Sequence, residues 1–397
     1  RSARTAPDAG TEANFLRCCY PGALHFPRQF SEAVLSGIHR LAASGRPFIL
    51  WNRTLSKAED ALEGIDGEAR TLDWHDLTAA IAPGDVVVSM LPADLHPEVA
   101  ERCLQRGAHF VSSSYLSPAM LNLDDAAKGK GLRFVNEVGL DPGIDHLMAH
   151  VLIADYQASG LMTPGHAHRF TSYCGGFPSQ LNAFRYKFSW SPLGVLRALK
   201  TPARWIEHGA EATIDIPRRA LTSYTVNLPH GQENFEAYPN RDSLPFTQQY
   251  GFTEEMNLQT FVRGTLRPEG WAEAWNEIFA VVEAANTEDA QLAALSDTLW
   301  SRHAYESDES DRVVLHVELD VTDNGQPVWN GSYVLDEHRN DSGTAMARLV
   351  SKTAGIAVEA ILDNQIPPGV SAAPSDRETA DAWLQELINS GERIIRS

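Results

Sequence analysis

Apolar runs alternate with amphipathic segments between residues 48 and 138. Short runs rich in Val, Ile and Phe are typical of buried strands, and the segments between them have the spacing of helices. Strands are expected over residues 48–51, 69–74, 85–90, 109–112 and 132–135, and helices over 56–62, 76–81, 98–106 and 118–130. This alternation predicts an α/β fold with a doubly wound parallel sheet of the Rossmann type.

The pattern changes after an expected helix over residues 147–156, where a long stretch rich in Gly, Pro, Asn and aromatic residues begins. Apolar and polar residues alternate strictly over residues 311–321, and an Asn-Gly turn at 324–325 leads into an apolar run over 329–335. This pattern predicts an antiparallel hairpin with one exposed face. A long apolar helix is expected over 344–362. The second half therefore reads as a separate, mixed α/β unit.

Charge and composition narrow the classes of partner. The chain has 397 residues, with 33 basic and 52 acidic side chains and a net charge of -19. This charge argues against nucleic acid or an anionic membrane surface as the main partner. No apolar run approaches the ~18 residues that a membrane helix needs, and residues 1–27 lack the apolar core of a signal peptide. The four cysteines fit neither a zinc site nor a disulfide framework, so we expect reduced thiols and a cytoplasmic location.

The segment Asn136–His146 follows the last expected strand of the parallel sheet. Gly139, Pro142 and Gly143 predict a turn there, and Asp141, Asp145 and His146 surround it. Ligands of open α/β sheets bind outside the carboxyl ends of the strands. Two carboxylates and an imidazole at this position indicate chemistry on a polar substrate.

The end of the second strand carries the candidate cofactor residues Asn52, Arg53 and Thr54. An acidic residue here would bind the ribose 2′-hydroxyl of NAD, whereas an arginine suits the 2′-phosphate of NADP. Asn52 and Thr54 add hydrogen-bonding groups. The alternative is that Arg53 is a solvated loop residue.

A Gly-rich phosphate-binding turn should precede the first helix of such a domain. With that helix expected over 32–43, the turn falls at 25–31, where there is no glycine. Either the N-terminal sequence is altered, by truncation, divergence or a reading-frame error, or the protein has lost dinucleotide binding.

Further polar groups follow the strands of the expected sheet. The backbone near Ser89 and Leu91 can meet a nicotinamide ribose, and hydroxyls cluster over residues 112–115. Helix capping accounts for Ser117 but not for Tyr115. Cys174 lies before a glycine pair that allows close approach of a ligand, although a free cysteine is more often a core residue.

Three arginines are candidates for carboxylate binding: Arg241, Arg263 and Arg267. They lie in segments rich in Gly and Pro, which are expected to be loops. Guanidinium groups bind carboxylates in a bidentate manner. For each arginine, the alternative is a surface salt bridge with one of the many acidic side chains.

Six segments together resemble the saccharopine dehydrogenase family, in the same order: residues 113–120, 136–146, 172–178, 186–192, 238–243 and 262–267. The resemblance implies a Rossmann domain over residues 1–137, completed by 340–370, and an α/β substrate domain with a small helical insertion over 138–339. It also implies a homodimer.

The resemblance also implies roles for individual residues. Asp141, Tyr115 and Cys174 are the expected catalytic residues, with His146 a further candidate for proton transfer. The expected substrate-binding residues are Ser114, Arg241, Thr265, Gly143 and Asn240. The expected cofactor-binding residues are Arg53, Thr54, Asn52, Leu91, Ser89 and Ser113. No metal is expected.

The implied activity is that of a nicotinamide enzyme of lysine metabolism, interconverting saccharopine with L-glutamate and 2-aminoadipate 6-semialdehyde. Arg53 favours NADP(H), while NAD(H) stays possible. One alternative is a related carboxynorspermidine-type enzyme that joins an amine to an aldehyde. The other is a cofactor-free member that binds an amino-acid ligand, which the missing glycine turn supports.

Overall fold

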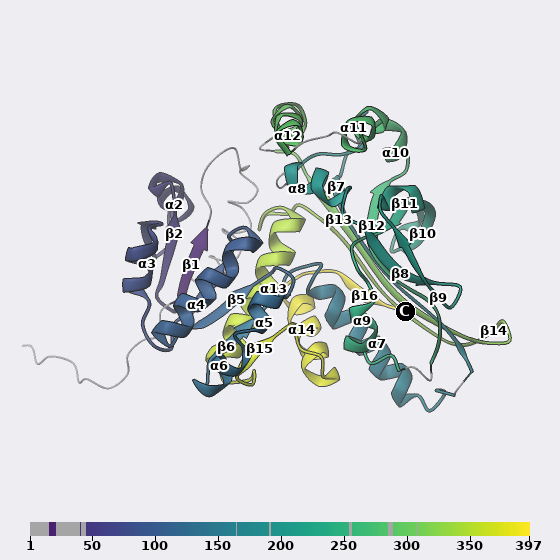
Figure 1. Cartoon of the computed structure of the whole chain (residues 1–397), viewed down its shortest axis with the longest axis horizontal. Coiled ribbons are helices and arrows are strands. Elements are labelled where there is room, and N and C mark those ends of the chain that lie inside the picture. The colour runs from purple at the N-terminus through teal and green to yellow at the C-terminus, as the bar shows by residue number, and fades with distance from the viewer. Residues whose placement is uncertain are drawn as a thin grey trace, which may run out of the picture.

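The computed structural model describes residues 16–20, 40, 45–163, 165–189, 192–253, 256–284, 289–306 and 308–397. These residues form two β-sheets with helices packed on them, and the long helix α13 (Ala345–Leu362) lies between the sheets (Figure 1). α13 contacts strands of both sheets, namely β4, β5 and β13. The expected glycine-rich turn at 25–31 and nearly all of the helix at 32–43 lie outside the described residues.

The first sheet has seven strands in the order β15-β6-β5-β4-β1-β2-β3, and each neighbouring pair is parallel. Its strands are β1 (Leu16–Tyr20), β2 (Phe48–Asn52), β3 (Glu68–Thr71), β4 (Val86–Ser89), β5 (His109–Ser112), β6 (Arg133–Val135) and β15 (Gly369–Ser371). The order of β1 to β6 is that of a Rossmann sheet, so the expected fold class is confirmed.

Both faces of this sheet are covered, which explains why its strands are apolar runs rather than alternating ones. Leu50 and Val86 pack in one core with α2 (Leu55–Ala61) and α13. Ile49 and Val87 pack in a second core with α3 (Trp74–Ala80) and α4 (His96–Arg106). The single helix expected over 118–130 is wrong, because two shorter helices occupy that range, α5 (Pro118–Leu121) and α6 (Asp124–Gly129). In α6, the Asp124 carboxylate accepts a hydrogen bond from the Val370 backbone, which ties the second helix to β15.

The second sheet is mixed, with the order β10-β11-β12-β7-β13-β14-β16 and a side branch of β8 and β9 on β12. Its strands are β7 (Ala167–Pro178), β8 (Ala203–Glu207), β9 (Ala210–Ile214), β10 (Thr222–Leu228), β11 (Gly231–Pro239), β12 (Asn257–Pro268), β13 (Asp311–Asp323), β14 (Gln326–His338) and β16 (Ile394–Arg396).

The Gly-rich segments around residues 174 and 264 are the centres of the long strands β7 and β12, not loops. Glycine is needed there because neighbouring backbone approaches closely. A Cβ added to Gly175 would lie 2.5 Å from the carbonyl oxygen of Leu266. The glycines therefore bring the two strands, and the side chains that they carry, close together.

The expected hairpin is confirmed as β13 and β14, joined by a turn in which Asn324 and Gly325 both have positive φ. The expectation of one exposed face is wrong for the first half of β13. There, His316 on the second face is only 5% exposed, and its Nδ1 lies within hydrogen-bond distance, 2.8 Å, of the Tyr224 hydroxyl of β10.

Helices at one end of the second sheet provide the expected small helical insertion (Figure 1). They are α8 (Pro192–Ala198), α10 (Trp271–Ala274), α11 (Asn276–Val282) and α12 (Asp289–His303). The other α-helices in the described residues are α7 (Ile144–Ala158), α9 (Pro245–Gln249) and α14 (Arg377–Asn389). No helix in the described part of the chain is long and apolar enough to cross a membrane.

A buried ion cluster anchors α13 to the end of the chain. Arg348 is fully buried and donates to Glu392 through two nitrogens, at 3.1 and 3.0 Å, and to Glu337 at 3.0 Å. It also donates to the backbone carbonyls of His338 and Gly343. α13, β14 and the segment before β16 are thus joined at one guanidinium.

Replacing Arg348 with methionine should lower the free energy of unfolding by about 3–5 kcal/mol, because it removes the cation that faces buried Glu337 and leaves buried Glu392 with Lys352 alone. A matched control is Arg197→Ala, which removes an exposed pair with Asp289 and should cost less than about 1 kcal/mol. Urea unfolding of both variants measures the difference. Equal losses would contradict the anchoring role of Arg348.

Candidate active site

A cavity of about 530 Å³ lies between the carboxyl edge of the parallel sheet, the second sheet and α13. Its wall includes Met90 and Ser113, which directly follow β4 and β5, and Met346 of α13. The polar groups that line it are Ser113, Ser114, Tyr115, Asp141, Cys174, Tyr186, Ser189, Arg241, Arg267 and Thr344. The cavity therefore joins the cofactor edge expected of a Rossmann sheet to a chamber in which these polar side chains lie among apolar ones.

The centre of this site is a cluster of four side chains. The Tyr115 hydroxyl donates to Asp141 Oδ1 at 3.0 Å. Arg263 Nη2 donates to the same oxygen at 2.8 Å and to Asp145 Oδ2 at 2.6 Å. The guanidinium also lies over the ring of Phe246, 4.0 Å from its centroid. Asp145 and Arg263 are buried, whereas Asp141 reaches the cavity.

The loop between β6 and α7 positions the two aspartates. Gly143 has φ of 147°, and a Cβ at this position would lie 2.1 Å from the Gly139 carbonyl oxygen, so only glycine fits. The Asp145 carboxylate, in the first turn of α7, accepts a 2.7 Å hydrogen bond from the Gly143 backbone. The expected turn thus folds back on itself and directs Asp141 into the cavity.

A second layer of polar groups lies behind this cluster. His146 Nε2 is 3.2 Å from Glu137 Oε2, and its Nδ1 is 2.6 Å from the Tyr250 hydroxyl. The imidazole stacks on Phe246 with an interplanar angle of 22°. Because His146 is completely buried and outside the cavity wall, it faces the carboxylates from the protein side.

The two aspartates of the site have opposite pKa shifts. Burial, together with the negative charge of Asp145, raises the pKa of Asp141, and Arg263 opposes this only in part. Burial also acts to raise the pKa of Asp145, but His146, Arg263 and the Gly143 N–H outweigh it and leave that pKa below its ordinary value. Asp145 is thus the permanent anion, and Asp141 is the carboxyl group that can take up a proton.

Cys174 faces the same cavity from β7. Burial and the negative charge of Asp141 raise the pKa of its thiol well above the ordinary value. A protonated thiol is a poor nucleophile, so the environment favours a neutral role for this side chain.

Ser89 and Ser114 are joined through a buried histidine. His96 Nδ1 lies 3.0 Å from the Ser89 hydroxyl and its Nε2 lies 2.9 Å from the Ser114 hydroxyl. Burial lowers the pKa of His96 to about 4, so the ring is neutral near pH 7. This bridge, which sequence reasoning did not identify, fixes the ends of β4 and β5 relative to each other.

The expected substrate and catalytic residues are largely brought together. Ser114, Tyr115, Asp141, Cys174 and Arg241 all line the cavity. Three others are not part of the cavity lining: Gly143 is buried in the loop, the Asn240 N–H donates to the Arg263 carbonyl, and Thr265 pairs with Cys174 in the sheet register.

The expected cofactor residues lie along the carboxyl edge of the parallel sheet. Arg53 is exposed just after β2, and the Asn52 side chain accepts a 2.9 Å hydrogen bond from the Thr54 backbone, which shapes the turn. Leu91 is buried in the core, so only its backbone could meet a ligand, whereas Ser113 lines the cavity. This edge, with a cation after its second strand, fits a phosphorylated dinucleotide.

The sequence indicated that Arg263 lies in a loop, where it would bind a carboxylate ligand or form a surface salt bridge, and both the loop and the surface position are wrong. It lies in β12, is buried, and forms its ion pairs with carboxylates more than one hundred positions away in the chain. Arg263, Thr265 and Arg267 occupy every second position, and this spacing is the signal that could have indicated a strand with the three side chains on one face.

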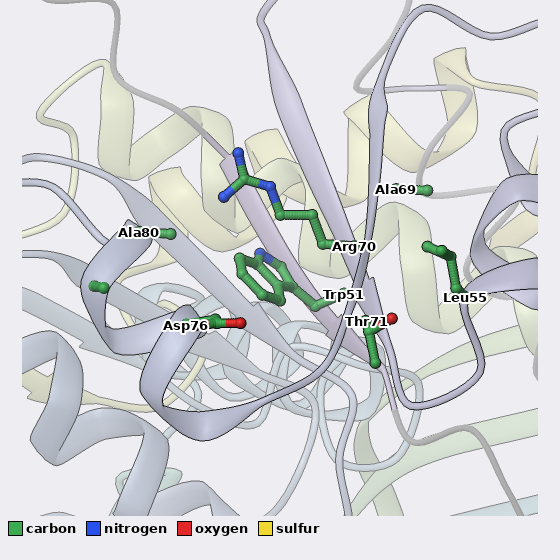
Figure 2. Close-up of a pocket in the computed structure, with 8 residues that line it drawn as sticks. Trp51, Leu55, Ala69, Arg70, Thr71, Asp76 and Ala80 are labelled. Atoms are coloured by element: carbon green, nitrogen blue, oxygen red, sulfur yellow. The ribbon is translucent and has the colours of Figure 1, made fainter.

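A second cavity lies beside β3, the edge strand of the parallel sheet (Figure 2). Arg70 extends over the indole of Trp51 there, 5.4 Å from the ring centroid, and Asp76 approaches from α3. Arg70 is already paired with Glu68 at 2.5 Å. The first cavity is therefore the better candidate for a site that binds a carboxylate substrate.

Comparisons with known proteins agree with this architecture. Residues 33–135 match the model of the saccharopine dehydrogenase NADP binding domain, and residues 139–392 match that of the saccharopine dehydrogenase C-terminal domain. The chain is 30% identical to saccharopine dehydrogenase [NADP(+), L-glutamate-forming] of Pyricularia oryzae, over 89% of this chain and 95% of that protein. It is also 30% identical to the Schizosaccharomyces pombe protein of the same name, over 86% of this chain and 91% of that protein.

A solved structure has the same fold throughout. The apo saccharopine dehydrogenase (L-Glu forming) from Saccharomyces cerevisiae superposes with a TM-score of 0.77 and 26% identity, covering 97% of this chain and 100% of that one. Together with the family matches, this similarity shows that the chain belongs to the saccharopine dehydrogenase family.

Proposed function

We propose that this protein is an NADP(H)-dependent saccharopine dehydrogenase that interconverts saccharopine with L-glutamate and 2-aminoadipate 6-semialdehyde. The observation that carries the proposal is the Tyr115–Asp141–Arg263 cluster, which opens into a cavity that also holds Arg241. The names and near-complete coverage of the similar fungal proteins support the same activity. The homodimer, the cytoplasmic location and the domain boundaries stay predictions.

The chemistry of saccharopine matches the groups in the cavity. Saccharopine is a secondary amine with three carboxylates and one primary amine. Arg241 reaches the cavity beside the Tyr115 ring, where a guanidinium can bind one carboxylate in a bidentate manner. When bound, NADP+ supplies the hydride acceptor for the carbon next to the secondary amine.

Asp141 is the group that we assign to proton transfer. The secondary amine must lose a proton before oxidation, and water addition and release of glutamate require further proton transfers. A carboxyl group with a raised pKa exchanges protons closer to neutral pH than an ordinary one. Tyr115, bonded to Asp141, can pass a proton between that carboxylate and the substrate. Cys174, as a neutral thiol, can donate a weak hydrogen bond nearby.

Arg53 supports the assignment of NADP over NAD. Its exposed position after β2 is where the ribose 2′-substituent lies in Rossmann domains. A guanidinium forms a charged hydrogen bond with the 2′-phosphate of NADP. Its hydrogen bond with the neutral 2′-hydroxyl of NAD is weaker.

The purified protein should reduce NADP+ in the presence of saccharopine, with a higher kcat/KM for NADP+ than for NAD+ because of Arg53. Nicotinamide absorbance measures the rate in both directions. Absence of both turnover and cofactor binding would favour the cofactor-free alternative. Cofactor binding without saccharopine turnover would favour the carboxynorspermidine-type enzyme.

Replacing Arg241 with alanine should raise the KM for saccharopine roughly ten- to a hundredfold, since it removes a charged hydrogen-bond donor. The KM for NADP+ should change little. Arg219→Ala, which removes an exposed guanidinium paired with Glu283, is the control and should leave both constants unchanged. Steady-state kinetics that show an unaltered KM for saccharopine would remove Arg241 from the site.

Replacing Asp145 with asparagine should shift the acidic limb of the pH profile of saccharopine oxidation to lower pH. The Asp145 anion raises the pKa of Asp141, so its loss lowers that pKa and leaves Asp141 ionised in more acidic solution. Asparagine keeps an oxygen that can accept from the Gly143 N–H. The measurement is kcat/KM for saccharopine against pH.

The control for this shift is Asp155→Asn, the same change near the other end of α7, where the carboxylate pairs with Arg377 outside the cavity. Its profile should match that of the unmodified protein. A shift to higher pH in the Asp145 variant, or none, would remove Asp141 from the titrating step.

A further inference from the structure

His96 joins two serine hydroxyls, and the direction of its hydrogen bonds decides what one of them can offer to a ligand. The His96 residue is 3% exposed, with Nδ1 3.0 Å from the Ser89 hydroxyl and Nε2 2.9 Å from the Ser114 hydroxyl. Ser89 is fully buried, whereas Ser114 lines the cavity. One end of this bridge is therefore enclosed by the protein, and the other end is open to a ligand.

The buried end determines which nitrogen of the ring carries the proton. A serine hydroxyl has one proton to donate, and a neutral imidazole has one N–H and one bare nitrogen. Among the described residues, His96 is the only hydrogen-bond partner of the Ser89 side chain. If Nδ1 carried the ring proton, the hydroxyl proton of Ser89 would be buried without an acceptor, which is costly. We therefore assign Ser89 as the donor to a bare Nδ1, and the ring proton to Nε2.

The charge of the ring agrees with this assignment. Burial lowers the pKa of His96 to about 4, so the ring carries a single N–H near pH 7. A doubly protonated ring would again leave the Ser89 proton without an acceptor. The ring also meets Phe110 of β5 edge to face, with centroids 5.9 Å apart and an interplanar angle of 67°. This contact restricts rotation of the imidazole between its two serines.

The bridge in turn directs the Ser114 hydroxyl. Because Nε2–H donates to Ser114 Oγ, the hydroxyl proton of Ser114 cannot point back at the ring. The backbone of this residue is held as well, since its N–H donates to Ser112 Oγ at 3.0 Å and its carbonyl accepts from the Glu137 N–H at 3.1 Å. Within the described part of the chain, the Ser114 side chain has no other hydrogen bond. Its proton is therefore left for an acceptor in the cavity.

We propose that His96 is a positioning residue, which accepts from Ser89, donates to Ser114, and so presents the Ser114 hydroxyl as a hydrogen-bond donor to an oxygen of the amino-acid substrate. His96 is not part of the cavity lining and acts through Ser114 alone. The three carboxylates of saccharopine supply suitable acceptors. The identity of the substrate rests on the proposed function, whereas the direction of the bridge rests on the contacts of His96.

Nitrogen NMR of the isotopically labelled protein tests the direction of the bridge without any substrate. The spectrum distinguishes a ring nitrogen that carries a proton from a bare one, and His96→Phe identifies the signals of this ring by their loss. We expect a protonated Nε2 and a bare Nδ1 near pH 7. A protonated Nδ1, or a doubly protonated ring, would overturn the assignment.

Steady-state kinetics test the effect of the bridge on substrate binding. Ser114→Ala should raise the KM for saccharopine roughly tenfold, because a hydrogen bond to a charged oxygen is lost. His96→Phe keeps a ring of similar shape without an N–H and should cause a similar rise. The double variant should be no worse than either single variant, since both changes remove the same contact. The KM for NADP+ should stay within about twofold in all three.

A conservative variant and a matched control separate positioning from packing. The amide of His96→Gln can donate to Ser114 Oγ, so this variant should recover part of the affinity that His96→Phe loses. The control is His168→Phe, since His168 is also buried and lies 3.0 Å from the Tyr156 hydroxyl, away from the cavity. His168→Phe should lower the temperature of thermal unfolding and leave the KM for saccharopine unchanged.

The two experiments distinguish a failure of the bridge from a failure of the proposed function. If the unmodified protein does not oxidise saccharopine but its ring proton lies on Nε2, the activity fails and the bridge stands. If the protein oxidises saccharopine and both single variants do so equally well, the positioning role of His96 fails alone. Losses that multiply in the double variant, or a rise confined to the KM for NADP+, would also overturn that role.

Discussion

The contact on which the site depends is the buried guanidinium of Arg263 between the carboxylates of Asp141 and Asp145. It joins β12 of the second sheet to the loop between β6 of the first sheet and α7. Without this cation, two carboxylates would face each other in a buried space, and at least one would have to be protonated or displaced. Arg263 therefore fixes the relative position of the two halves of the cavity as well as the charge at its centre.

The same cation gives the two aspartates different roles. Asp145 lies on the protein side, where Arg263, His146 and the Gly143 N–H all favour its ionised form. Asp141 lies on the cavity side, where burial and the neighbouring Asp145 anion raise its pKa and Arg263 opposes them only in part. A pair of carboxylates with separated pKa values is a common basis for acid–base chemistry. Here the separation follows from which partners each side chain can reach.

Much of the parallel sheet could be predicted from the sequence, because strands such as Val86–Ser89 and His109–Ser112 are short apolar runs, and their periodicity is local. The long strands β7 and β12 could not, since their glycines and arginines weaken the apolar pattern. Those glycines are required by contacts that form only in the folded sheet, such as Gly175 against Leu266. The loop with Asp141 could be predicted from the sequence, because its glycines and proline favour a turn through their own backbone preferences.

The charged residues around the cavity also differed in how far the sequence could predict them. Asp141, Tyr115 and Arg241 were expected through motifs of neighbouring residues, and they line the cavity. The ion-pair partners of the arginines could not be predicted from the sequence, because the carboxylates that pair with Arg263 are more than one hundred positions away in the chain.

Helix α13 connects this electrostatic arrangement to the stability of the whole fold. Met346 and Val350 on one side of the helix form part of the cavity wall, while Arg348 and Lys352 on another side are held by Glu392 near the end of the chain. Apolar contacts of α13 with β4 and β5 define the edge where the cofactor is expected, and its contacts with β13 belong to the second sheet. Displacement of α13 would therefore change both the width of the cavity and the distance between the cofactor edge and Asp141. A rigid ion cluster at Arg348, outside the cavity, is a means of fixing that distance without placing further charge in the site.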